Sequence, residues 1–328
     1  MKKKFRWGII GTGGIANAFA HDIELIKDHQ IIAVGSRTKT NAEKFSSIFP
    51  GCKAHHSYLE CIKNPDVDGI YIATPHNSHY EYSILALENN KPVLCEKPIA
   101  INFNEAEKMI FKANQKNLLI MDAMWTRYLP HILLLKRLLK EKKVGEIKTL
   151  FVDHGQNLSN NFNPRLWDPN LGGGALLDLG IYVVSFAHLI LGIPNTISSD
   201  TIKNNNGIDL TTSIIFNYDD AQAIMNATMI NNTPCEAIIS GTKGYIKVYG
   251  RFYAPTKMKL RLNSGEEKIF KNHYKGHGLR EQAIEFARCK NLGLNQSPLM
   301  PHSEILDVMK SMDIIREQIG LKYPNDNI

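Results

Sequence analysis

The stretch that decides the fold is residues 5–27, FRWGIIGTGGIANAFAHDIELIK. Residues 5–10 are mostly apolar and have the length of a short buried strand. A glycine-rich turn follows at 11–14, and apolar residues then recur three and four positions apart, at Ile15, Phe19, Ile23 and Ile26. That spacing is typical of one buried helix face. The stretch therefore predicts a strand, a tight turn and a helix in immediate succession.

Working outward, strand-like and helix-like segments alternate up to residue 123. The predicted strands are 5–10, 31–35, 69–73, 92–95 and 118–122, and the predicted helices are 14–27, 40–49, 80–89 and 103–116. Continuous apolar strands that alternate with helices indicate a parallel sheet covered on both faces. Residues 1–123 are therefore predicted to form a Rossmann-type, doubly wound α/β domain.

Beyond residue 123 the pattern changes. After a helix at 130–142, strands follow one another at 147–154, 209–217, 222–230, 236–241, 245–249 and 257–263. Helices are expected at 174–191, 279–290 and 303–319. Residues 124–328 are therefore predicted to form an α+β domain with a large, mostly antiparallel open sheet, whose last helix can pack back on the first domain. A chain of 328 residues fits two domains of about 150 residues each.

Composition narrows the classes of partner. The 39 Lys and Arg exceed the 32 Asp and Glu by seven, but they are scattered, so nucleic-acid binding is not expected. The longest apolar stretch, 175–193, contains Asp178 and His188, which argues against a membrane span. Five cysteines form no C-x-x-C pair, so we expect a reducing, cytoplasmic environment. The histidine clusters lack a suitably spaced third ligand, so no metal site is predicted.

The turn at residues 11–16, GTGGIA, fits the pattern G-x-G-x-x-A. Gly11 permits a tight turn, Gly13 lets the backbone approach a pyrophosphate, and the small Ala16 allows close packing of strand and helix. The N–H groups that open the helix, near Gly14 and Ile15, then face the phosphates together with Thr12. An ordinary tight turn is the alternative, but the place between a strand and a helix favours dinucleotide binding.

The end of the second strand bears on which dinucleotide binds. NAD sites usually carry an acidic residue there, whereas residues 35–39 read GSRTK. Ser36 and Thr38 can donate hydrogen bonds to a 2′-phosphate, and Arg37 can form a charge-assisted contact. This pattern favours NADP(H) over NAD(H), with a solvated basic turn as the alternative.

Candidate catalytic residues follow two further elements. Glu96-Lys97-Pro98 comes directly after the strand at 92–95, where ligands bind in open α/β sheets. Asp178 and Tyr182 lie four residues apart, on one face of an otherwise apolar helix. That helix pair is equally compatible with two satisfied polar groups in a buried helix.

These segments resemble the Gfo/Idh/MocA oxidoreductases over nearly the whole chain. The resemblance rests on WGIIGTGGIA, GIYIATPHNSHYEYSILALENNKPVLCEKP, DAMWTRYLP and GGGALLDLGIYVVSFA. The family usually has Asp-x-x-x-His on the second-domain helix, where this chain has Asp178 and Tyr182. With Trp125 and Arg127, this variant looks like the branch of dimeric dihydrodiol dehydrogenase, D-xylose dehydrogenase and glucose–fructose oxidoreductase.

The resemblance implies a role for each matching position. Lys97 would be the catalytic lysine, Tyr182 the general acid/base, and Asp178 a group that helps to hold the substrate. Cofactor contacts would further include Thr74, Pro75, Asn77, His79 and Glu96, and Trp125, Arg127 and Trp167 would line the substrate pocket. Pro98 would follow a cis peptide bond, and the open sheet of the second domain would form a homodimer.

The implied chemistry is hydride transfer between NADP(H) and a secondary alcohol or hemiacetal carbon of a sugar, polyol or trans-dihydrodiol. A tyrosine hydroxyl has an ordinary pKa near 10, and a nearby ammonium favours its ionised form. Lys97 can supply that ammonium for Tyr182. Two alternatives stay open: an NADP(H)-binding sensor without turnover, and an enzyme for an amino acid, a bile pigment or an imine.

Overall fold

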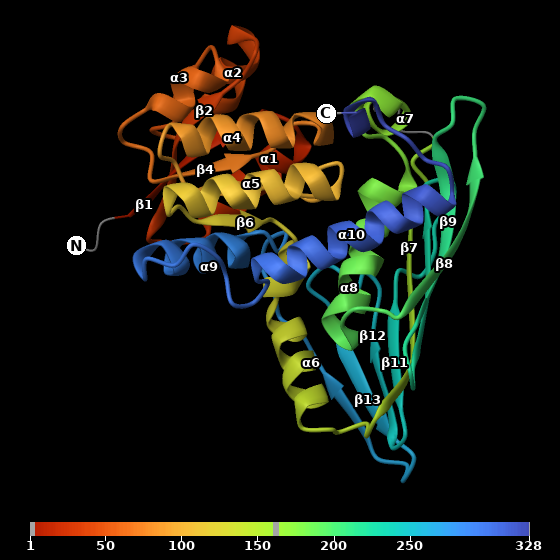
Figure 1. The fold of residues 1–328 in the computed structure, drawn as a ribbon. Coiled ribbons are helices and arrows are strands. Elements are labelled where there is room, and N and C mark those ends of the chain that lie inside the picture. Colours follow the sequence, from red (N-terminus) through yellow and green to blue (C-terminus); the bar gives the residue numbers. More distant parts are fainter. Residues whose placement is uncertain (1–3, 160–163, 328) are drawn as a thin grey trace. The chain divides into compact units, whose positions relative to one another are not determined.

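The computed structural model describes residues 4–159 and 164–327. The chain forms two compact units, which are described separately (Figure 1). Unit 1 comprises Met1–Trp125 and Lys275–Ile305, and unit 2 comprises Thr126–Tyr274 and Leu306–Ile328.

Unit 1 is built on a six-stranded sheet of order β3-β2-β1-β4-β5-β6, and every neighbouring pair in it is parallel. The strands are β1 (Phe5–Ile10), β2 (His29–Gly35), β3 (Lys53–His55), β4 (Gly69–Ile72), β5 (Val93–Cys95) and β6 (Ile120–Asp122). The connecting helices are α1 (Gly14–Glu24), α2 (Lys39–Ser46), α3 (Tyr58–Lys63), α4 (His79–Glu88) and α5 (Phe103–Lys116). The doubly wound parallel sheet is confirmed.

An aromatic cluster fills the core of unit 1 at β1. Trp7 is fully buried, and its ring lies 5.3 Å from that of Phe19 on α1 and 5.1 Å from that of Phe286. Phe19 in turn stacks on Tyr71 of β4 at 3.8 Å. These contacts hold α1 against the sheet and so fix the position of the turn at residues 11–14.

Residues 275–305 differ from the predicted division, which placed them in the second domain. Helix α9 (Arg280–Asn291) contributes Phe286 to the core of unit 1, where its ring also lies 6.0 Å from that of Phe5. The carboxylate of Asp22 on α1 accepts hydrogen bonds from the backbone N–H groups of His277, Gly278 and Leu279, at 2.7–2.8 Å. An apolar face and a buried carboxylate thus bind this helix to unit 1.

Unit 2 is built on an eight-stranded sheet of order β14-β13-β12-β11-β7-β10-β9-β8. The strands are β7 (Ile147–Gly155), β8 (Thr196–Lys203), β9 (Asp209–Asn217), β10 (Gln222–Thr228), β11 (Ala237–Gly241), β12 (Gly244–Val248), β13 (Met258–Leu262) and β14 (Glu267–Phe270). Only β7 and β10 pair in parallel; the other neighbours are antiparallel. The mostly antiparallel open sheet is therefore confirmed.

The helices of unit 2 lie on one face of this sheet (Figure 1). They are α6 (Pro130–Lys140), α7 (Pro164–Trp167), α8 (Ile181–Leu191) and α10 (His302–Gln318), which begins in unit 1. A π-helical turn, Leu176–Gly180, leads directly into α8. The stretch Pro169–Leu191 is long and apolar enough to cross a membrane, but most of it is buried inside the protein, as in the core helix of a soluble domain.

Candidate active site

The glycine turn of unit 1 has the geometry that dinucleotide binding needs. Gly11 has φ +105°, and a Cβ there would lie 2.5 Å from the carbonyl oxygen of Ala73, so the position requires glycine. A Cβ on Gly13 or Gly14 would meet no atom of the described chain within 4 Å. The backbone of these two glycines, together with the partly exposed Thr12, is therefore open to a ligand.

The start of α1 completes a phosphate-binding arrangement. Gly13 is the N-cap, and no side chain in the described part of the protein caps it. The first N–H groups of α1, from Gly14 and Ile15 onward, are thus available to an anion. The hydroxyl of Thr74, just beyond β4, is buried without a hydrogen-bond partner among residues 4–159 and 164–327. An open helix start and an unsatisfied hydroxyl fit a bound dinucleotide.

The residues predicted to bind a 2′-phosphate lie just beyond β2. Ser36 is buried, and its Oγ accepts a hydrogen bond from the backbone N–H of Thr38 at 3.3 Å. Arg37 and Thr38 are exposed. Burial raises the pKa of Tyr58, and the nearby Arg37 guanidinium opposes that shift. The basic side chain is thus beside an aromatic ring, and no carboxylate occurs in residues 35–39.

The loop after β4 is tied to the segment after β5 through His79. Its imidazole is fully buried, with Nδ1 2.8 Å from the carbonyl oxygen of Pro98 and Nε2 3.0 Å from that of Thr74. The structure thus places His79 as a link between two loops. Pro75 and Asn77 lie half-buried on the surface of the same loop.

Glu96 and Lys97 occupy the carboxyl end of β5, as the sequence indicated. Glu96 is buried and accepts a very short hydrogen bond from the hydroxyl of Tyr71. Its other oxygen accepts from the backbone N–H of Lys97 at 3.3 Å. Lys97 is half-buried, and the Lys97–Pro98 peptide is cis, as the resemblance implied. Glu96 therefore acts within the protein as a support for the segment that carries Lys97.

Tyr182 of unit 2 lies in a cluster of rings. Its ring centroid is 5.1 Å from that of His154, at the end of β7, and 5.0 Å from that of Tyr253. His154 stacks on Tyr253 at 4.1 Å, and Gln156 Nε2 donates to the hydroxyl of Tyr253 at 3.0 Å. Burial raises the pKa of Tyr253 to about 12, so its hydroxyl stays protonated at neutral pH.

Asp178 precedes Tyr182 by one helical turn and forms an ion pair with Arg165 on α7, with Nη2 and Oδ1 3.1 Å apart. The pair is mostly buried. Sequence reasoning missed Arg165, His154, Gln156 and Tyr253. Two polar residues at and just beyond the end of β7, His154 and Gln156, were the local signal in the sequence that could have pointed to this cluster.

The three residues predicted to line the substrate pocket, Trp125, Arg127 and Trp167, contact different parts of the protein. Trp125 is almost buried in unit 1, with its ring 5.4 Å from that of His277. Trp167 packs partly buried against the apolar cluster around Leu166 and Leu179 in unit 2. Arg127 is 1% exposed, and its guanidinium donates to the hydroxyl and carbonyl oxygens of Ser185 at 3.0 and 2.6 Å. The structure thus gives Arg127 contacts with Ser185 of α8, and its place in the substrate pocket stays a prediction.

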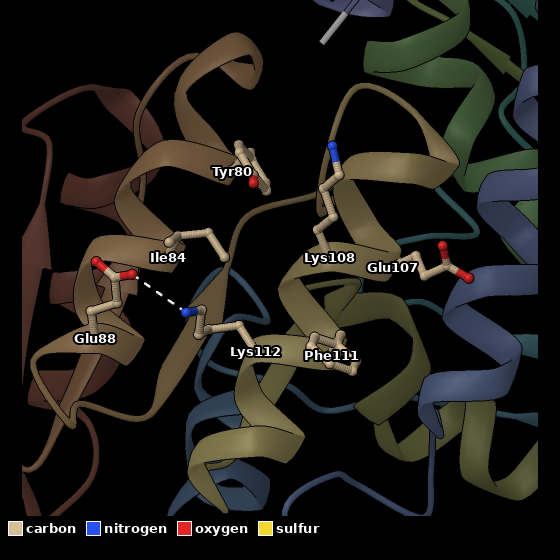
Figure 2. A pocket seen from close by; sticks show the side chains of 7 residues that line it. All are labelled: Tyr80, Ile84, Glu88, Glu107, Lys108, Phe111 and Lys112. Carbon is tan, nitrogen blue, oxygen red and sulfur yellow. Dashed lines mark hydrogen bonds and ion pairs between the residues drawn. The ribbon is translucent and has the colours of Figure 1, made fainter.

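A separate surface groove lies between α4 and α5 of unit 1 and has a volume of about 490 Å³ (Figure 2). Figure 2 shows Lys112 of α5 reaching toward Glu88 of α4, and their charged atoms are 3.4 Å apart. None of the predicted site residues lines this groove, whose walls are Tyr80, Ile84, Glu88, Glu107, Lys108, Phe111 and Lys112.

Comparisons with known proteins agree with this arrangement. Residues 5–123 match the Gfo/Idh/MocA sequence model described as an oxidoreductase family with an NAD-binding Rossmann fold, and residues 132–247 match the Gfo/Idh/MocA C-terminal domain. Trans-1,2-dihydrobenzene-1,2-diol dehydrogenase of Mus musculus is 34% identical, over 98% of both chains, and that of Xenopus laevis is 33% identical, over 97% of this chain and 99% of the relative.

Solved structures show the same fold over nearly the whole chain. A 3-ketoreductase from Actinomadura kijaniata, solved with NADP and TDP-benzene, superposes with a TM-score of 0.87 at 21% identity, covering 97% of this chain and 98% of that chain. Aldose-aldose oxidoreductase from Caulobacter crescentus, solved with glycerol, superposes with a TM-score of 0.86 at 20% identity, covering 96% and 97%. The chain belongs to the Gfo/Idh/MocA oxidoreductase family and is an NAD(P)-dependent dehydrogenase.

Proposed function

We propose that this protein is an NADP(H)-dependent oxidoreductase that transfers hydride between the nicotinamide and a secondary alcohol or hemiacetal carbon. The observation that carries the proposal is the pairing of residue types that the two units offer. Unit 1 presents Lys97 at the carboxyl end of β5, and unit 2 presents Tyr182 in a polar aromatic cluster. A protein that only sensed NADP(H) would need neither a positioned amine nor a positioned phenol.

Each residue of the proposed site has a task in the reaction. The bound nicotinamide supplies the hydride acceptor or donor. The ionised Tyr182 side chain takes the substrate hydroxyl proton in oxidation, and the neutral Tyr182 hydroxyl returns a proton in reduction. The Lys97 ammonium stabilises the ionised phenol and donates a hydrogen bond to the reacting oxygen. Asp178, held by Arg165, accepts a hydrogen bond from a second substrate hydroxyl.

The cofactor preference rests on the turn after β2. Ser36 and the exposed Arg37 and Thr38 offer donors where an NAD site would offer a carboxylate. A 2′-phosphate then gains charge-assisted hydrogen bonds from Arg37 and meets no acidic side chain within residues 35–39.

We place the substrate among compounds with adjacent hydroxyls, and a trans-dihydrodiol is our first choice. Two relatives more than 30% identical over nearly the full chain carry the name trans-1,2-dihydrobenzene-1,2-diol dehydrogenase. Sugars and polyols share the vicinal diol, and the fold is shared with an aldose-aldose oxidoreductase. The ring cluster of His154, Tyr182 and Tyr253 suits a flat or cyclic diol.

The proposed assembly is a homodimer through the sheet of unit 2. One face of this sheet carries an apolar row, formed where Ile238, Phe151, Ile224 and Ile215 lie opposite one another on four neighbouring strands. Phe151 is 45% exposed, and Ile224 and Ile215 are each more than one third exposed. These apolar side chains become buried when the same face of a second copy packs on them.

The experiment that tests this function is a set of initial rates of NAD(P)H formation with a trans-dihydrodiol, D-xylose, D-glucose and myo-inositol. Each substrate is paired with NADP+ and with NAD+. We expect turnover with the dihydrodiol or an aldose, and a higher kcat/KM for NADP+. NADPH binding without turnover on any member of the panel would contradict the proposal and favour a sensor.

A further inference from the structure

A buried carboxylate lies at the start of the helix that carries Asp178 and Tyr182. Asp209, the first residue of β9, is fully buried. Its Oδ2 accepts hydrogen bonds from the backbone N–H of Leu176 at 2.6 Å and from the hydroxyl of Thr212 at 3.1 Å. Leu176 opens the π-helical turn that contains Asp178 and leads into α8.

The chain around this contact is shaped to admit Asp209. Gly174, two residues before Leu176, has φ +118°, and a Cβ there would lie 2.0 Å from Oδ1 of Asp209. Oδ1 finds no hydrogen-bond donor in the described part of the chain. The helix start and the carboxylate are therefore packed against each other, and any side chain at Gly174 would push them apart.

This contact differs from an ordinary N-cap. A usual cap comes from the residue just before the helix, where it satisfies one of the first N–H groups. Here Ala175 precedes the turn and has no capping side chain, so the acceptor comes from a strand 33 residues away in the sequence. The helix start is thereby fixed to the sheet, and Gly180 lies close to β10: a Cβ added at Gly180 would lie 3.5 Å from the Cβ of Ala227. Both contacts set where Asp178 and Tyr182 lie.

We propose that Asp209 is a positioning residue for the reaction: by holding the N–H of Leu176 from β9, it fixes the helix that presents Asp178 and Tyr182 to the substrate. This inference rests on the proposed function, since it assigns Tyr182 the proton transfer. Asp209 does not touch the substrate in this account. Its effect is confined to unit 2, because all the groups that hold it belong to that unit.

The groups around Asp209 also predict a pH signature. Burial raises the pKa of Asp209 to about 7, while its hydrogen bonds and the Lys203 ammonium oppose the rise. Tyr323 also interacts electrostatically with Asp209, and its hydroxyl donates to the carbonyl oxygen of Gly173 at 2.9 Å. An ionised carboxylate binds the Leu176 N–H more strongly than a neutral one. We therefore expect kcat to increase with pH around pH 7, as the Asp209 carboxyl group ionises.

The test compares D209A and D209N with the wild type, and uses D200N as the control, since Asp200 is an exposed carboxylate on β8. We expect D209A to lower kcat about ten- to a hundredfold, because small displacements of a reacting group cost that much. NADPH affinity should stay within about twofold of the wild type, since unit 1 is unchanged. D209N, which retains only a neutral acceptor, should have a kcat close to that of the wild type below pH 7 and should lose the ionisation near pH 7. D200N should match the wild type.

Hydrogen exchange separates this inference from the proposed function. D209A should exchange faster than the wild type in peptides that cover Leu176–Tyr182, whatever substrate the enzyme uses. Wild-type protein without turnover on any substrate, together with that faster exchange, would overturn the proposed reaction and leave the helix contact supported. Wild-type kcat and wild-type exchange in D209A would overturn the positioning role. If D209A does not fold, an unchanged pH profile in D209N would overturn it.

Discussion

At the scale of single residues, the turn after β2 is where charge decides the cofactor. We predict that Ser36→Asp lowers kcat/KM for NADP+ at least about tenfold and raises it severalfold for NAD+. The new carboxylate would repel the 2′-phosphate and could accept a hydrogen bond from a ribose 2′-hydroxyl. Steady-state kinetics with both cofactors measures the change. Ser47→Asp adds the same charge at an exposed position beyond α2 and should leave both constants unchanged.

Residues next to one another in the sequence were the ones that could be predicted. The glycines at 11, 13 and 14, the Glu96-Lys97-Pro98 segment and the Asp178/Tyr182 pair each form a local pattern. Arg165, His154 and Tyr253 come from separate elements, and only the tertiary fold brings them to Asp178 and Tyr182. The resemblance placed Arg127 in the pocket wall, and the structure adds its contacts with Ser185, which no local pattern indicates.

At the scale of elements, the link between α1 and α9 can be tested directly. We predict that Asp22→Ala destabilises unit 1 by at least about 2 kcal/mol, because three N–H groups, two of them buried, lose their charged acceptor. Urea unfolding followed by tryptophan fluorescence measures the loss. Glu24→Ala removes an exposed carboxylate from the same helix and is the control. An Asp22→Ala midpoint equal to that of the control would contradict this account of why residues 275–305 belong to unit 1.

Two buried histidines of unit 2 predict how its stability depends on pH. Burial lowers the pKa of His131 and of His188 to about 4 each. Between pH 6.5 and 4 the unfolded chain therefore binds two more protons at these sites than the folded one, so stability falls as pH falls. Asp209, with its pKa raised to about 7, acts in the opposite sense and cancels about one of the two protons.

We therefore predict a net loss of stability of unit 2 from pH 6.5 to pH 4, measured as the free energy of unfolding in urea. His188→Asn should reduce the slope of the free energy of unfolding against pH by about the contribution of one proton. His21→Asn, at an exposed histidine of unit 1, should leave it unchanged. A slope that His188→Asn does not alter would contradict the assignment.

Elements with a strong local period were predicted to within a few residues, and weak ones were missed. The alternation of strands and helices in unit 1 and the antiparallel strands of unit 2 follow from apolar periodicity. Strand β8 was missed because it is an edge strand, TISSDTIK, with few apolar residues. Strands β3 and β14 are only three and four residues long. The π-helical turn was predicted as plain helix, because the turn and α8 are apolar on almost every side and so show no phase shift at the extra residue.

At the scale of the whole molecule, the apolar row of unit 2 predicts the assembly. We expect Phe151→Lys to convert a dimer into a monomer, because it places a charge at the centre of the row that a second copy would cover. Light scattering coupled to size-exclusion chromatography measures the mass. Phe111→Lys changes an exposed aromatic residue in the α4–α5 groove of Figure 2 and should leave the mass unchanged. A monomeric wild type, or a dimeric Phe151→Lys, would contradict the proposed interface.

The division of the chain could be predicted only in part. The change of pattern near residue 123 lies close to the first crossing between the units, at Trp125 and Thr126. The return of residues 275–305 to unit 1 depends on Phe286 and on the Asp22 carboxylate, which are more than 250 residues apart in the sequence. Contacts at that separation leave no local pattern.

The central claim is that Tyr182 and Lys97 carry out the proton transfer, and one measurement tests it most directly. NADPH formation and NADPH binding are measured in the same samples for the wild type, Tyr182→Phe and Lys97→Met, with the best substrate of the panel. We predict that both variants bind NADPH within about threefold of the wild type and lose at least about a hundredfold in kcat. Turnover close to that of the wild type in either variant would contradict the account.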